Sequence, residues 1–253
     1  MAETRTTLEA VAWRALPDAF GQTDRVPFLL RKLTSGDDGE RKEALAEAWY
    51  TLWHQGTVYA CTPATVPFLV DVIVNTGVSE RIRTEVGFLL REVARAQSFV
   101  LPEDPTTQWL ARWWPDSGSP PRDLDVECRA AVAAQGERLG AALPSAGPAL
   151  EAALVGVFGA VPEAVTADVH DRLTVLERLG DTLLAAAAGL VLILAAGHPA
   201  ERDLRSRAEL DGDVADWLGS ISDYWPVDEQ GSGLVSELCA KVADAHLARP
   251  NAE

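Results

Sequence analysis

Cysteine is scarce in this chain. Its 253 residues include three cysteines, Cys61, Cys128 and Cys239, which lie far apart. An odd and widely spaced set argues against a disulfide framework and for a reducing compartment. The first residues also lack a basic segment followed by an apolar core, so no secretory signal is predicted. We therefore expect a cytoplasmic protein.

Basic residues are also few, and they form no long cluster. The chain has 22 Lys and Arg against 38 Asp and Glu, which gives a formal net charge of −16. A protein that binds nucleic acid needs a positive surface, because contacts with phosphate supply most of its affinity. Nucleic-acid binding is therefore not predicted.

The familiar patterns of catalytic and metal-binding residues are missing as well. The four histidines, His54, His170, His198 and His246, are scattered, and no cysteine pair has the spacing of zinc ligands. The sequence has no glycine-rich phosphate loop and no nucleophile elbow. We expect no metal, no cofactor and no catalysis.

One long stretch lacks charge altogether. Residues 182–200 contain no Asp, Glu, Lys or Arg, and their length is near the ~20 residues of a membrane-spanning helix. However, residues 185–189 are only weakly apolar, and Gly197 and Pro199 end the helix early. We expect a central helix buried within the protein, and no contact with a membrane.

What the chain does contain is a repeat with a period of forty residues. The letters VPFLL at residues 26–30 return as VPFLV at residues 66–70. Apolar residues at helical spacing follow each copy, so each unit is predicted to be a helical hairpin that stacks on its neighbour. The positions expected to be equivalent and buried are Val26 with Val66, and Phe28 with Phe68.

A family resemblance lies in the same region. Residues 49–59, with the sequence WYTLWHQGTVY, are followed by Thr62 and by VPFL at residues 66–69. This stretch resembles bacterial HEAT-repeat proteins, a mostly uncharacterised group. The resemblance implies an all-α fold in which helical hairpins stack into a HEAT-like α–α superhelix, or solenoid. It implies no single activity, since HEAT proteins include scaffolds, lyase-like subunits and DNA-binding relatives.

Periodic apolar residues predict helices along most of the chain, in one domain over residues 1–253. The repeats are clear at 20–97 and divergent at 98–253. The second helix is expected to run from about residue 40 to His54, with Gly56 as the left-handed residue that ends it. The inner face of a later helix is expected to carry Val126, Ala130, Ala133 and Leu139. The later helices are predicted near residues 106–114, 124–143, 149–158, 162–179, 182–196, 200–210, 213–221 and 233–248.

The acidic residues are most concentrated near the C-terminal end. Residues 209–229 contain no Lys or Arg, and aromatic residues lie among their acids. Aromatic anchors with a charged rim are common at protein interfaces, so this segment is a candidate binding surface for a basic partner protein. The alternative is a capping repeat whose polar face only keeps it in solution. The candidate residues are Asp211, Asp213, Asp216, Trp217, Asp223, Tyr224, Trp225 and Asp228.

Two smaller groups stay open. His54, Gln55 and Tyr59 either form a turn after a helix or line a ligand site. A second group resembles the tryptophans and aspartate of HEAT-like DNA glycosylases, which hold a cationic base. Packing of these tryptophans around a helix and its exit loop is the alternative. The members of this second group are Trp109, Trp113, Trp114 and Asp116.

Taken with the charge, these patterns favour a protein-binding module or scaffold without catalysis. A sharper form of this hypothesis is an immunity-type protein that neutralises a basic toxin or nuclease, because an acidic surface attracts such a partner. An enzyme of the HEAT-like glycosylase or lyase type is the alternative from a different class. The sequence leaves the oligomeric state open.

Overall fold

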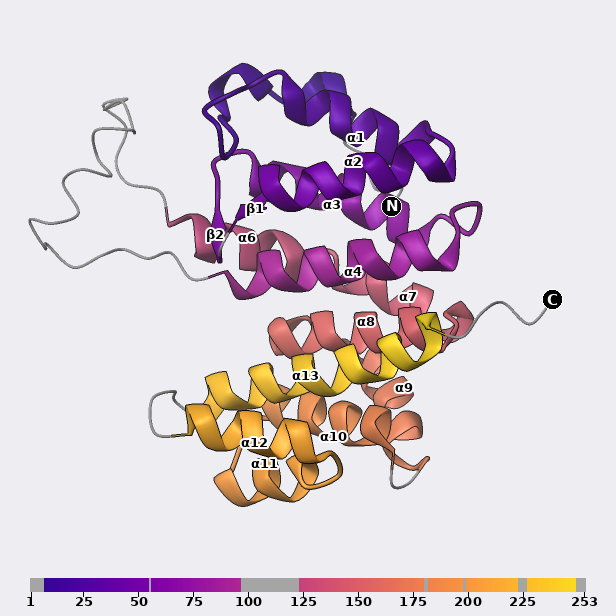
Figure 1. Cartoon of the computed structure of the whole chain (residues 1–253), viewed down its shortest axis with the longest axis vertical. Helices are drawn as coiled ribbons and strands as arrows, with labels where there is room; N and C mark the ends of the chain where they lie inside the picture. Colours follow the sequence, from indigo (N-terminus) through magenta and orange to yellow (C-terminus); the bar gives the residue numbers. More distant parts are fainter. Residues whose placement is uncertain are drawn as a thin grey trace, which may run out of the picture.

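The chain is mostly helical, and its helices lie one above another along the long axis of the molecule (Figure 1). The computed structural model describes residues 7–54, 56–96, 123–179, 182–197, 199–222 and 227–248. Within these residues, the only strands are two short ones of two residues each, so the all-α prediction is confirmed.

The N-terminal half consists of two helical hairpins. Helices α1 (Arg25–Ser35) and α2 (Asp38–Thr51) pack together, as do α3 (Thr62–Val74) and α4 (Glu80–Arg95). The hairpins stack in register, since α1 contacts α3 and α2 contacts α4. Two 3-10 helices, η1 (Leu8–Ala10) and η2 (Trp13–Ala15), precede them.

The predicted burial of Phe28 and Phe68 is correct for Phe68 and wrong for Phe28. Val26, Val66 and Phe68 are buried as expected, but Phe28 is 55% exposed. The reason is the place of α1 at one end of the stack, where none of the other described helices covers its outer face (Figure 1). Phe68 on α3 is covered instead by Trp13, whose ring centre lies 6.1 Å away.

The end of α2 also differs from the prediction. The helix ends at Thr51, and Trp53–His54 form strand β1, which pairs antiparallel with β2 at Thr57–Val58. Gly56 has the expected left-handed backbone, with φ +86°, but it sits in the turn of this β-hairpin and does not end a helix. A glycine is suited to this place because such turns need a positive φ.

The C-terminal half begins with a helix that the sequence predicted as one piece. Instead, α6 (Leu124–Ala133) and α7 (Gly136–Ala142) are separated at residues 134–135. Of the predicted inner residues, Leu139 is buried and Ala133 is half-buried, but Val126 and Ala130 are exposed. On α6, Cys128 and Val132 are buried instead. The elements that follow are η4 (Leu143–Ser145), α8 (Pro148–Ala160), η5 (Pro162–Ala164), α9 (Ala167–Glu177), α10 (Leu183–Ala195), α11 (Glu201–Ala208), α12 (Gly212–Ile221) and α13 (Val227–Leu247).

The last helix returns to the middle of the stack. Helix α13 packs against both α8 and α10, and α8 also packs against α4 (Figure 1). Helix α8 is buried along almost its whole length. The uncharged helix α10 is largely buried too, as predicted, and no helix in the described ranges is both long and apolar enough to cross a membrane.

Candidate functional site

The β-hairpin between α2 and α3 is held at both ends by one side chain. Thr62 Oγ1 donates to the carbonyl of Leu52 at 2.7 Å and accepts the N–H of Tyr59 at 3.0 Å. A single buried hydroxyl therefore joins the residue before β1 to the residue after β2. These two hydrogen bonds fix the position of the hairpin, and with it the positions of Trp53 and Gly56.

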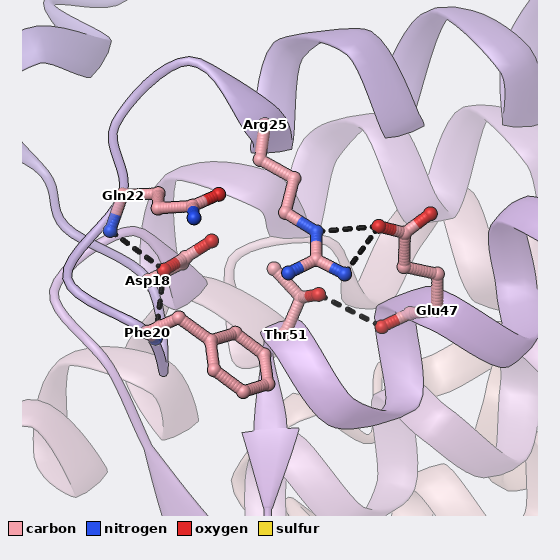
Figure 2. A network of polar contacts seen from close by, with 6 residues as sticks. All are labelled: Asp18, Phe20, Gln22, Arg25, Glu47 and Thr51. Carbon is pink, nitrogen blue, oxygen red and sulfur yellow. Dashed lines mark hydrogen bonds and ion pairs between the residues drawn. The ribbon is translucent and has the colours of Figure 1, made fainter.

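A buried carboxylate folds the N-terminal loop, and the backbone of this loop bonds to the end of α2 (Figure 2). Asp18 is 1% exposed, and its Oδ1 accepts the N–H groups of Phe20 at 2.8 Å and Gln22 at 2.9 Å. The N–H of Ala19 donates to the carbonyl of Thr51, the last residue of α2, at 3.3 Å. The loop thus closes on the point where the hairpin begins.

An ion pair joins the same loop to the first two helices. Arg25 at the start of α1 binds Glu47 on α2, and the guanidinium lies 5.0 Å from the centre of the Phe20 ring (Figure 2). The hydroxyl of Thr51 donates to the backbone carbonyl of Glu47 at 2.8 Å. These contacts hold the loop, α1 and the end of α2 together next to the hairpin.

Beside the hairpin lies a groove of about 700 Å³. Residues from the hairpin and from the ends of α4, α6, α8, α10 and α13 line it, on the side of the molecule where β1 and β2 are labelled in Figure 1. The apolar part of the lining includes Trp53, Val126 and Leu194. The charged part consists of Glu92, Arg95, Asp125, Arg129 and Glu229.

Close approach of two helices forms one wall of this groove. Gly159 of α8 faces Val235 of α13, and a Cβ on the glycine would lie 2.5 Å from the valine Cγ1. Only glycine allows the two backbones to come this near. Gly159 itself lines the groove, and Glu229 and Ser232 of α13 lie beside it.

The two arginines of the groove differ in their partners. Arg129 binds both carboxylate oxygens of Glu163 at 2.7 Å. Arg95 lies 3.9 Å from Glu92, which is beyond hydrogen-bonding distance. Glu92 in turn already accepts a hydrogen bond from Arg91 at 2.8 Å.

Burial acts on Arg95 more strongly than its neighbours do. Its side chain is 21% exposed, and this desolvation lowers the pKa of the guanidinium below its ordinary value. The nearby carboxylate of Glu92 opposes the shift, whereas the positive charge of Arg91 adds to it. The guanidinium stays charged at neutral pH, because arginine begins so far above it.

The acidity of the chain lies almost entirely in its C-terminal half. Residues 123–248 contain 21 acidic and eight basic residues, a net charge of −13. Residues 7–96 contain 12 acidic and ten basic residues, a net charge of −2. The net negative charge is therefore concentrated in the C-terminal half of the molecule.

Part of the predicted acidic segment has a cationic partner in the fold. Asp211 caps α12 by accepting the N–H of Val214 at 3.1 Å, and this bond is the main cause of its lowered pKa. Lys241 of α13 lies 3.5 Å from Asp211 and 2.5 Å from Asp213. The sequence segment alone did not reveal this lysine, because it follows many residues later.

The rest of that segment divides into three kinds of residue. Asp216 is exposed, whereas Trp217 is half-buried and packs against the core. Asp223, Tyr224 and Trp225 lie outside the described residues, as does the side chain of Asp228. The segment remains a predicted partner-binding surface.

The two smaller candidate groups fare differently. His54 is half-buried in β1, with its ring centre 6.1 Å from that of Tyr50, and Tyr59 is buried in the core. Gln55 lies outside the described residues, and the hairpin residues that line the groove are Trp53 and Gly56. The cluster of Trp109, Trp113, Trp114 and Asp116 also lies outside the described residues, so the glycosylase hypothesis stays a prediction from sequence.

Comparison with known proteins assigns no family to this chain. No family model matches it, and neither a curated protein nor a solved structure matches it.

Proposed function

We propose that this protein is a HEAT-like α-solenoid that acts in the cytoplasm as a protein-binding module, and that its partner is a basic protein. The observation that carries this proposal is the charge asymmetry, with a net charge of −13 on residues 123–248. Charge on one part of a surface steers an oppositely charged partner and orients it during encounter.

The stacking of the first two hairpins supports the solenoid part of the proposal. Helices α1 and α3 lie in contact, as do α2 and α4, which is the arrangement of consecutive repeats. The forty-residue period of the sequence agrees with it. The return of α13 to α8 is a departure from contacts between neighbouring repeats alone.

An immunity-type protein that neutralises a basic toxin or nuclease is a sharper form of the same proposal. The acidity favours it, because active sites that bind nucleic acid carry positive charge, and a negative surface can cover them. Binding to nucleic acid by this chain itself is disfavoured by the same charge.

The test begins with affinity capture of partners by the tagged full chain, followed by kinetics with the purified partner. We expect a basic partner whose association rate falls as salt shortens the Debye length from ~10 Å to ~3 Å. Neutralising three exposed acids of the C-terminal half should slow association roughly tenfold at low salt. This variant carries Glu209→Gln, Asp213→Asn and Asp216→Asn.

The control variant removes three acids of the N-terminal half, with the same change of net charge. It carries Glu9→Gln, Asp24→Asn and Glu43→Gln, all at exposed positions. We expect its association rate to stay within about twofold of the wild type, because charges far from the contact are screened. Equal rates for both variants, or an acidic partner, would refute the proposal.

A further inference from the structure

We propose that the groove beside the β-hairpin binds an extended segment of the partner protein, and that Arg95 is the anchor for an Asp or Glu side chain of this segment. The inference rests on the proposed protein-binding function and adds the chemistry of the bound segment.

The first support is the unused hydrogen-bonding capacity of Arg95. A guanidinium carries five N–H donors in a rigid fork, which matches a carboxylate. Yet within the described part of the chain, the guanidinium of Arg95 makes no hydrogen bond, and its nearest acidic group, Glu92, is 3.9 Å away. Glu92 Oε1 accepts a hydrogen bond from Arg91 at 2.8 Å and lies too far from Arg95 to accept one from it.

The second support is the position of the side chain. Arg95 lines the groove and is 21% exposed, so it has lost most of its water without gaining protein acceptors. Partial loss of water without replacement by protein acceptors is unfavourable for a charged group, and a ligand that supplies the acceptors offsets this loss. Arg129 offers no such opportunity, since it is 44% exposed and already holds Glu163.

The surroundings of Arg95 select a single carboxylate in preference to a phosphate. Glu92, Asp125 and Glu229 also line the groove, and they repel a doubly charged group more strongly than a singly charged one. Trp53, Val126 and Leu194 provide apolar contacts for neighbouring residues of the segment. Basic residues elsewhere in the segment would meet the carboxylates, in agreement with a basic partner.

The size of the groove fits a peptide segment better than a whole protein surface. Its volume of about 700 Å³ lies within the range of pockets that enclose small ligands, roughly 300–1,000 Å³. A few residues in extended form fill such a space, and the remaining interface would then spread over the acidic half.

The probe for the test is a phage-displayed library of random peptides, selected on the full chain. Enriched peptides should share an Asp or Glu, and the strongest is then synthesised for calorimetry. Arg95→Gln should weaken its binding by about 10- to 100-fold, the range for a hydrogen bond between charged groups. Arg81→Gln, a matched control on the same helix but outside the lining of the groove, should weaken it by less than about threefold, because Arg81 is an exposed residue paired with Glu85.

A double-mutant cycle identifies the contact itself. Replacing the shared acid of the peptide by its amide should weaken binding to the wild type, and should have little further effect on Arg95→Gln. Arg95→Lys should recover only part of the affinity, since an ammonium group lacks the fork. Thermal unfolding of Arg95→Gln should not occur at a lower temperature than that of the wild type, which would show that the loss of binding is local to the site.

Several outcomes would overturn the inference. They are selection without any enriched peptide, enrichment without an acid, and wild-type affinity in Arg95→Gln. Loss of binding upon amidation of the peptide C-terminus would assign the contact to a terminal carboxylate instead. Competition by inorganic phosphate would point to a phosphate site. None of these results depends on the acid-neutralised variants, so the proposed function is tested independently of the groove.

Discussion

Two thiols lie in surroundings that keep them protonated. Burial, with a smaller contribution from the nearby Asp18 carboxylate, raises the pKa of Cys61 from 9.0 to about 12. Burial does the same to Cys239, although the charge of Arg91 opposes the shift. The raised values make these cysteines part of the apolar core and poor nucleophiles at neutral pH.

These thiols predict a loss of stability in alkaline solution. The unfolded chain releases their protons above pH 9, whereas the folded chain retains them until about pH 12, so the free energy of unfolding falls as the pH rises through this window. Each thiol should lower it by about 1 kcal/mol between pH 9 and 10. Urea unfolding of Cys61→Ala and Cys239→Ala should therefore show flatter pH profiles than the wild type. Unchanged profiles would mean that the thiols ionise in the folded protein.

The two phenylalanines of the repeat provide a second prediction at this scale. Phe68→Ala should lower the free energy of unfolding by ~3–5 kcal/mol, because the side chain is 4% exposed. Phe28→Ala should cost less than about 1 kcal/mol, since its ring is mostly exposed and interacts chiefly with Lys32. Denaturant unfolding measures both, and similar costs would contradict the difference between the end and the inside of the stack.

At the scale of helices and strands, the sequence predicted most elements but not their junctions. Apolar spacing located α4, which presents one buried face, whereas long apolar runs located α8 and α10, which are buried on nearly all sides. The same spacing extended α2 into Trp53 and His54, which lie in β1. Periodicity failed there because the strand depends on a hydrogen bond from Thr62, which the local pattern does not show.

Two glycine substitutions should have opposite effects, because Gly159 lies in the contact between α8 and α13, whereas Gly219 lies on an open face of α12. Gly159→Ala should destabilise the protein by ~1–3 kcal/mol, because the new methyl group would overlap Val235. Gly219→Ala in α12 should stabilise it by ~0.5–1 kcal/mol, since nothing lies within 4 Å and alanine favours a helix. Thermal unfolding distinguishes the two, and a neutral Gly159→Ala would mean that α13 can move away freely.

At the scale of the whole molecule, the groove and the charge asymmetry have different origins. The asymmetry is a property of composition and can be counted from the sequence. The groove is a property of the fold, because its lining comes from the hairpin and from helices as far apart as α4 and α13. Nothing in the spacing of Trp53, Arg95 and Glu229 predicts that they share one cavity, and so the sequence missed it.

The continuity of the core predicts a single unfolding transition. One cluster of buried side chains extends from Trp13 to Cys239, and the packing of α4 on α8 joins the two halves. Calorimetry should therefore give one peak, with a van't Hoff enthalpy equal to the calorimetric enthalpy. Two separate peaks would show that the halves are independent domains.

The return of α13 has a consequence for how the protein is made. The apolar faces of α8 and α10 are covered by a helix that the ribosome delivers after all the others described here. The first two hairpins can pack as they emerge, since their contacts are local. The apolar faces of the second half stay exposed to solvent until α13 has been synthesised. During this time the second half is the part of the chain most prone to aggregate and to bind chaperones.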